Sequence, residues 1–137
     1  MSDRTSAIAS AFGSARDYDR HAHVQRRAAE ALAERIAALE LESPRLLEFG
    51  CGTGFLTDAL IRRGVGGQWR VTDLAPDMVE RCRSRMAGRG DLTFSVLDVA
   101  RGEPDGHGAF DVVTASLAAQ WLGDLDGAVG RMLRWVR

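Results

Sequence analysis

Apolar residues recur along this chain at two spacings, and the alternation between them predicts its secondary structure. Intervals of three and four positions, as among Ala28, Leu32 and Ile36, gather apolar side chains on one face of a helix. Short apolar runs that end in an acid or a serine are typical of buried strands. The predicted helices cover residues 21–41, 55–63, 76–87 and 125–136. The predicted strands cover residues 45–49, 69–73, 93–97 and 110–116.

Strands that alternate with helices in this way predict an α/β fold, with a Rossmann-like parallel sheet covered by helices on both faces. The sheet is expected to follow an N-terminal helical segment. In open sheets of this kind, ligands bind at the carboxyl ends of the strands. The glycines after the first strand, together with Asp73, Asp98 and Ser116, all fall at such ends. We therefore expect one shared site there.

The segment 46–56 is an apolar strand that ends in Glu48, followed by Gly50, Gly52 and Gly54 and then by a helix. Without a Cβ atom, glycine lets the main chain turn tightly and approach a ligand closely, beside the N-terminus of a helix. The dinucleotide fingerprint G-x-G-x-x-G requires its third glycine at position 55, which is Phe55. The spacing therefore favours a nucleotide-like ligand other than NAD.

Three acids at the strand ends are candidate ligand contacts. Asp73 ends the second strand, 23 residues after Gly50. This is close to the interval at which an acid after the second strand binds both ribose hydroxyls. The alternative is a surface acid that opposes the dipole of the next helix. Asp98 is either an acceptor for an exocyclic amine such as that of adenine or an ordinary turn residue. Glu48 could neutralise a cationic group of the ligand, tether the glycine loop by accepting backbone N–H bonds, or do both.

Composition narrows the expected function further. The 137 residues carry a formal net charge of −1, which predicts no general attraction to nucleic acid or to anionic membranes. No apolar run approaches a membrane span and the N-terminus lacks the apolar core of a signal peptide, so a cytoplasmic protein is expected. Cys51 and Cys82 are expected to stay unpaired there. No metal site is expected, because His21 and His23 would not share a helical face.

Three segments resemble the motifs of class I S-adenosylmethionine-dependent methyltransferases. Residues 47–54 (LEFGCGTG) resemble motif I, residues 71–78 (VTDLAPDM) the ribose-binding segment, and residues 97–99 (LDV) the adenine-binding segment. Both ends of the chain are similar to a narrower group, the biotin-pathway malonyl-acyl-carrier-protein O-methyltransferases. The residues that carry this similarity are 11–13 (AFG), 18–26 (YDRHAHVQR) and 116–121 (SLAAQW).

The resemblance implies S-adenosylmethionine as the cofactor and implies roles for single residues. Gln120 and Trp121 become functional candidates by resemblance alone, and the alternative for Trp121 is a packed aromatic side chain at a helix start. At the methionine part of the cofactor, the implied contacts are Glu48, Gly50 and Gly52, with Cys51 between the two glycines and Tyr18 closing over that end. Asp73 and Leu74 would contact the ribose and adenosine, and Asp98 and Val99 the adenine. Ser116 would lie near the sulfonium.

The implied reaction methylates the free carboxylate of a malonyl thioester, malonyl-acyl-carrier protein, in biotin biosynthesis. Such a carboxylate is ionised near neutral pH, so the protein mainly has to align two reactants, and no catalytic residue is assigned. The acidic carrier would meet a face that bears Arg16, Arg20, Arg26 and Arg27, for which an ordinary solvated helix face is the alternative. Malonyl-CoA and other small acids are alternative acceptors.

Members of this family are usually longer, with a seven-stranded sheet. We therefore expect a single domain over 1–137. Residues 1–44 form an N-terminal lid and helix, and residues 45–137 form a cofactor-binding half of about four strands. The C-terminal half, which builds most of the acceptor site in the family, is expected to be absent. A fourth strand at the outside of the sheet would leave an unpaired edge, which predicts a homo-oligomer or limited stability. Two other functions stay open: a non-catalytic module that binds cofactor or a partner, and an NAD-binding Rossmann domain.

Overall fold

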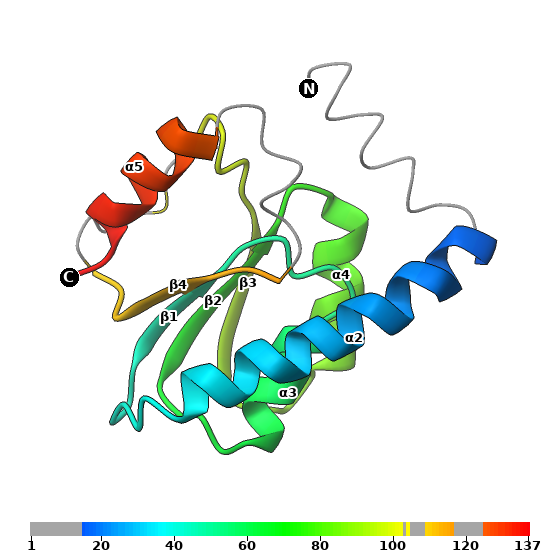
Figure 1. Cartoon of the computed structure of the whole chain (residues 1–137), viewed down its shortest axis with the longest axis horizontal. Helices are drawn as coiled ribbons and strands as arrows, with labels where there is room; N and C mark the ends of the chain where they lie inside the picture. Colours follow the sequence, from blue (N-terminus) through cyan, green and yellow to red (C-terminus); the bar gives the residue numbers. More distant parts are fainter. Residues whose placement is uncertain (1–14, 103, 105–108, 117–124) are drawn as a thin grey trace.

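The described residues place four parallel strands at the centre of the fold. The computed structural model describes residues 15–102, 104, 109–116 and 125–137. Each neighbouring pair of strands is parallel, and Glu48 lies opposite Val71 on one side and Thr114 on the other. The predicted parallel sheet is confirmed. Its strands are β1 (Arg45–Glu48), β2 (Gln68–Asp73), β3 (Asp91–Val96) and β4 (Val112–Thr114), in the order β3-β2-β1-β4 (Figure 1).

Helices in the described residues connect and cover these strands, and none of them is long and apolar enough to span a bilayer. The first helix ends at Ala37, before position 41, where the apolar spacing predicted its end. Glu40 and Ser43 have left-handed φ angles of 51° and 49°, so the chain turns there. Leu39 is 60% exposed as a result. The helices are α2 (Ala15–Ala37), α3 (Phe55–Arg62), α4 (Pro76–Arg85) and α5 (Leu125–Trp135).

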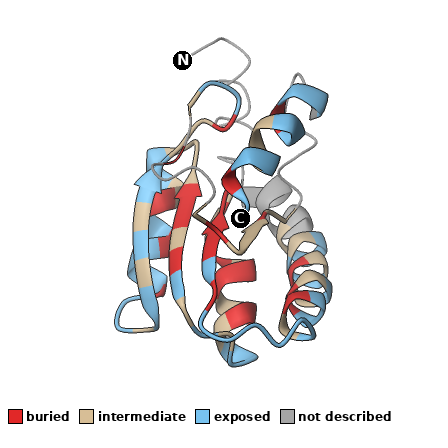
Figure 2. Cartoon of the chain, turned by 90° about the vertical axis from the view of Figure 1, so that its left-hand side faces the viewer, coloured by how far each residue is buried: buried red, intermediate tan, exposed pale blue. Residues whose placement is uncertain are grey.

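Each face of the sheet carries its own apolar layer. Successive side chains of a strand point to opposite faces, so the fully buried neighbours Leu46 and Leu47 belong to two different clusters. Leu46 packs in the cluster that contains residues of α2, α3 and α4, and Leu47 packs with Trp135 of α5. Burying each leucine contributes roughly 1.5–3 kcal/mol. Figure 2 shows the buried residues along β1 and on the inner sides of the helices, so helices cover both faces, as predicted.

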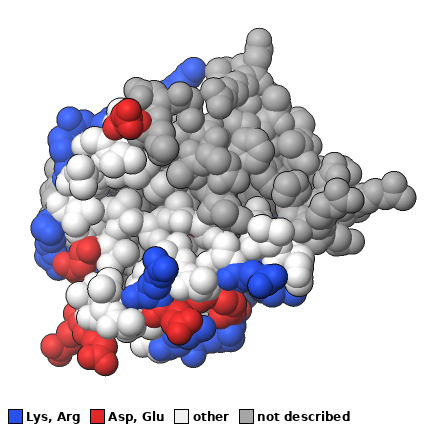
Figure 3. All heavy atoms as spheres, in the orientation of Figure 1, with Lys and Arg blue, Asp and Glu red and all other residues white. Residues whose placement is uncertain are grey.

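A chain of ion pairs joins α2 to α3 and to the turn before β3. Glu30 of α2 pairs with Arg62 and Arg63, while Asp58 of α3 pairs with Arg62 at 2.8 Å and with Arg89 at 2.7 Å. Acidic and basic side chains accordingly lie side by side along the lower part of the molecule in Figure 3. Exposed pairs of this kind each contribute only about 0.2–1 kcal/mol, so burial supplies most of the stability of this face.

β4 lies at the edge of the sheet and pairs with β1 alone among the described strands, which confirms the expected edge. It is shorter than the predicted 110–116. Phe110 pairs outside the sheet, whereas the Asp111 amide still donates to the Arg45 carbonyl of β1 at 2.7 Å. Phe110 forms a parallel bridge with Val136, and Asp111 accepts hydrogen bonds from the Arg45 amide at 2.9 Å and the Arg137 guanidinium at 2.7 Å. Leu133 of α5 is 70% exposed, so the apolar face of this helix is only partly covered, as expected.

Candidate functional site

The loop that joins β1 to α3 is the centre of the candidate site. Gly50, Gly52 and Gly54 have φ angles of 65°, 55° and 100°, a conformation that glycine adopts far more readily than other residues. A Cβ atom at Gly54 would lie 3.1 Å from Cys82 Sγ, whereas one at Gly52 would meet no atom within 4 Å. The loop is therefore packed against α4 at Gly54 and open at Gly52, where a ligand has room to approach the main chain.

The Asp73 carboxylate ties this loop to the end of β2. One carboxylate oxygen accepts a hydrogen bond from the Gly52 amide at 2.8 Å, and the other accepts one from the Ala75 amide at 2.9 Å. Burial raises the pKa of Asp73, and backbone hydrogen bonds from Ala75, Gly52 and Leu74 oppose that rise. Because a carboxylate has about four acceptor positions, Asp73 keeps capacity for ligand hydroxyls while these amides hold its orientation.

Glu48 lies beneath the loop, with only 1% of its surface exposed. The Thr57 hydroxyl of α3 donates to its carboxyl group at 2.6 Å, and the Thr72 hydroxyl of β2 donates to its main-chain oxygen at 2.8 Å. Burial raises the pKa of Glu48 to about 8; the bond from Thr57 opposes the rise, and Cys82 and Asp73 add to it. The bond to the Glu48 carboxyl group thus comes from a side chain of α3 and not from the backbone N–H groups of the loop that the sequence suggested. The roles of Glu48 toward a ligand stay a prediction.

A row of buried polar side chains continues from Glu48 toward α4. Thr57 Oγ1 lies 3.9 Å from Cys82 Sγ, and Cys51 Sγ of the glycine loop donates to the Gly52 carbonyl at 3.5 Å. The neighbouring Cys82 and burial raise the pKa of the Cys51 thiol, which therefore stays protonated at neutral pH. Both cysteines are free. Sequence reasoning missed Thr57, although a threonine within the apolar face of a helix was an available signal.

The end of β3 lies beside the end of β2. The Leu97 amide donates to the Asp73 carbonyl at 3.0 Å, which brings Leu74 and Asp98 into neighbouring turns. Both of these side chains are half-buried, and Val99 is buried. Asp98 Oδ1 accepts a hydrogen bond from the amide two residues later at 3.0 Å. The turn role of Asp98 is thus observed, and its second carboxylate oxygen has no hydrogen bond to any residue that the structure describes.

Ser116 follows β4, the strand next to Glu48. The Thr114 carbonyl before it accepts the Phe49 amide at 3.0 Å, and the buried Ser116 hydroxyl has no partner within the described part of the chain. Tyr18 lies in α2, but its side chain, like Gln120 and Trp121, falls outside the described residues. The structure therefore brings all the predicted site residues except Tyr18 to the carboxyl ends of the strands.

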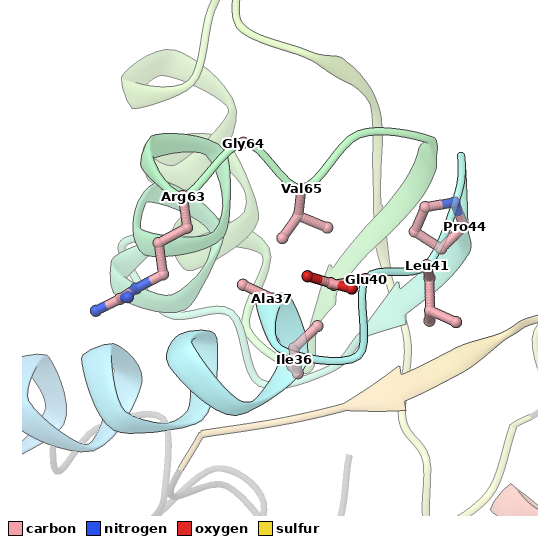
Figure 4. Close-up of a pocket in the computed structure, with 8 residues that line it drawn as sticks. All are labelled: Ile36, Ala37, Glu40, Leu41, Pro44, Arg63, Gly64 and Val65. Atoms are coloured by element: carbon pink, nitrogen blue, oxygen red, sulfur yellow. The ribbon is translucent and has the colours of Figure 1, made fainter.

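A cavity of about 100 Å³ lies at the other end of the strands, between the last turns of α2 and α3 (Figure 4). Its walls include Ile36, Leu41, Pro44 and Val65, and none of the predicted site residues. Ligands of open parallel sheets bind at the carboxyl ends, so this cavity is separate from the candidate site. Over the described ranges, no group of three His, Cys, Asp or Glu side chains is arranged to hold a metal ion.

Known proteins with similar sequences include methyltransferases. The family described as "Methyltransferase domain" matches residues 47–137. The biotin biosynthesis bifunctional protein BioCD of Bordetella avium is 47% identical over 134 residues, which are 96% of this chain and 28% of that protein. The malonyl-acyl-carrier-protein O-methyltransferase of Magnetococcus marinus is 43% identical over 130 residues, which are 93% of this chain and 47% of that protein. The chain thus spans less than half the length of either relative.

A solved methyltransferase structure has a similar fold. SAM-bound CalS10, an amino pentose methyltransferase from Micromonospora echinaspora, matches with a TM-score of 0.63 at 28% identity, over 82% of this chain and 47% of that one. The residues matched by the family begin at Leu47 in β1 and include the glycine loop, Asp73, Asp98 and α5. Sequence and fold agree, and the chain belongs to the methyltransferase domain family.

Proposed function

We propose that this chain is the cofactor-binding part of an S-adenosylmethionine-dependent methyltransferase. The observation that carries the proposal is the Asp73 carboxylate, which holds the Gly52 amide and retains acceptor positions at the carboxyl end of the sheet. A ribose offers two adjacent hydroxyl donors to such a group. The open approach at Gly52 also fits a bound cofactor, as does the Ser116 hydroxyl, which has no partner among the described residues. The name of the SAM-bound relative CalS10 supports the same ligand.

The residues divide by the part of the cofactor that they would hold. When bound, S-adenosylmethionine supplies a methyl group on a sulfonium. The loop main chain and the Asp73 carboxylate then bind and orient the ligand, and no side chain has to move a proton. The proposed contacts are Glu48, Gly50, Cys51, Gly52 and Tyr18 at the methionine part, Asp73 and Leu74 at the ribose and adenosine, Asp98 and Val99 at the adenine, and Ser116 near the sulfonium.

We infer that the acceptor is the free carboxylate of malonyl-acyl-carrier protein, in biotin biosynthesis. The name of the Magnetococcus marinus relative supports this substrate, and the name of the Bordetella avium relative supports the pathway. A carboxylate oxygen bonds to the methyl carbon while the electron pair of the breaking C–S bond stays on sulfur, so alignment is the task of the protein. Arg26 and Arg27, both exposed on α2, belong to the face proposed for the acidic carrier. Arg26 also lies over the Phe55 ring, at 5.2 Å from its centroid.

The proposal also covers the cellular location of the protein and its self-association. We place the protein in the cytoplasm, where the free thiols of Cys51 and Cys82 would stay reduced. We also infer self-association through the edge of β4 and the exposed apolar residues of α5, Val129 and Leu133. The net charge of −1 favours neither nucleic acid nor an anionic membrane as a partner.

Calorimetry with S-adenosylhomocysteine and with NAD tests the cofactor. We expect S-adenosylhomocysteine to bind and Asp73→Ala to weaken its binding by about tenfold, because hydrogen bonds to a charged group are lost. Asp91→Ala, at the exposed amino end of β3, is the matched control and should keep the wild-type affinity. Binding of NAD alone would overturn the proposal. An assay of methyl transfer to malonyl-acyl-carrier protein then separates an enzyme from a module that binds cofactor without turnover.

A further inference from the structure

Arg131 of α5 reaches the turn that follows β3. Its Nη1 donates to the Ala100 carbonyl at 2.8 Å, and its Nη2 donates to the Val99 carbonyl. These carbonyls are consecutive, so the planar guanidinium holds the main chain at two points, which suits the fixed fork of arginine better than the single ammonium of lysine. Val99 is 6% exposed and packs in the same cluster as Trp135, one turn further along α5. α5 therefore holds this turn from the second face of the sheet.

The same turn carries Asp98, the residue proposed to accept the amine of adenine. Its first residue is anchored to β2, because the Leu97 amide donates to the Asp73 carbonyl at 3.0 Å. Asp98 Oδ1 is occupied within the turn by the Ala100 amide at 3.0 Å. The position of the second carboxylate oxygen thus depends on where Ala100 lies, and Arg131 is the side chain from another element that holds Ala100 in place.

The Arg131 contact carries an energetic cost as well as a gain. Arg131 Nε is buried and has no hydrogen-bond partner among the residues described, and a buried unsatisfied donor destabilises a folded protein. A methionine would carry no buried donor there, but it would also leave the Val99 and Ala100 carbonyls without this partner. The arginine is explained if the two carbonyls of the turn have to be held in one position.

We propose that Arg131 is a positioning residue for adenine recognition, acting through Asp98. The inference rests on the proposed cofactor. With Val99 and Ala100 held, the second oxygen of Asp98 keeps one direction and accepts the exocyclic amine of adenine. Hypoxanthine carries an oxygen in place of that amine and would set one acceptor against another. A rigid turn therefore discriminates between the two bases, whereas a mobile turn lets Asp98 rotate away and the discrimination is lost.

Calorimetry on the full chain with S-adenosylhomocysteine and with S-inosylhomocysteine, its hypoxanthine analogue, tests this proposal. We expect the wild type to prefer the adenosyl ligand by about tenfold or more. Arg131→Met should bring the ratio close to one by weakening the adenosyl ligand, and Arg131→Lys should fall between. Arg35→Met, at the exposed end of α2, is the matched control and should keep the ratio.

A wild-type ratio that survives in Arg131→Met would overturn the positioning role. A wild-type chain that binds both ligands equally would also overturn the positioning role, but it would not contradict the proposal that the chain binds S-adenosylmethionine. If the wild type binds neither ligand, the proposed function itself fails, and this inference fails with it.

Hydrogen exchange of the unliganded chain gives a second measurement. The amides of residues 99–102 should exchange about fivefold faster or more in Arg131→Met than in the wild type, while those of β1 keep their rates. Faster exchange throughout the chain, with a lower melting temperature, would show a purely structural residue and would refute the proposal. Unchanged exchange in 99–102 would refute it as well.

Discussion

Replacement of Glu48 by glutamine should make the protein more stable, and increasingly so as the pH rises. The Glu48 carboxyl is 1% exposed and accepts the Thr57 hydroxyl at 2.6 Å. Burial raises its pKa from 4.5 to about 8. Between these two values the folded chain keeps a proton that the unfolded chain has lost, so the free energy of unfolding falls as the pH rises. Above about pH 8 both states are ionised and this contribution stops changing.

The size of the effect follows from the pKa values. A rise from 4.5 to about 8 corresponds to about 5 kcal/mol at high pH, since each unit is worth about 1.4 kcal/mol. Integrated over the titration, the change between pH 5 and pH 8.5 is about 4 kcal/mol. Glutamine does not titrate and still offers Thr57 a carbonyl acceptor. The difference in stability between Glu48→Gln and wild type should therefore grow by about 4 kcal/mol over that interval.

Urea denaturation of the two proteins at a series of pH values between about 5 and 8.5 measures this difference. The matched control is Glu34→Gln, which removes an exposed acid of α2 and should give a difference from wild type that hardly changes with pH. Parallel stability curves for wild type and Glu48→Gln across the series would refute the reasoning, because they would mean that Glu48 ionises equally in the folded and unfolded chain.

Three further outcomes follow from single contacts. Gly54→Ala should lower the free energy of unfolding by about 1–3 kcal/mol, because an alanine there combines a φ of 100° with a Cβ only 3.1 Å from Cys82 Sγ. Gly52→Ala has a strained φ but no obstructing atom, so it should lower that free energy less in urea denaturation. Equal losses in the two variants would contradict the packing argument. Thr57→Val should destabilise by about 1–2 kcal/mol at pH 7, since it leaves the Glu48 carboxyl without its donor; an unchanged urea midpoint would count against that bond. Leu133→Gln should reduce self-association in analytical ultracentrifugation without lowering the melting temperature, because Leu133 is 70% exposed; the wild-type distribution of species in the variant would argue against this surface.

Local rules were sufficient to place most of the elements. The predicted ranges of β1, α3 and α4 agree with the structure within two residues, because the glycines of the loop and Pro76 interrupt the chain whatever the remainder does. The predicted end of the first helix was wrong, since Leu39 continues the helical spacing while the chain already turns at Glu40. A pattern of side chains reports the face on which they would lie, but it does not report where the backbone leaves the helix.

The sequence by itself determined the fold class, the glycine loop and the acids at the strand ends, because these depend on periodicity and on a few neighbouring residues. The roles of the individual cofactor contacts stay predictions. Only the tertiary structure decided the order β3-β2-β1-β4, the burial of Glu48 against Thr57 and the hold of Arg131 on Val99. These contacts join different elements and leave no periodic signal, since their geometry exists only once the helices have packed onto the two faces of the sheet.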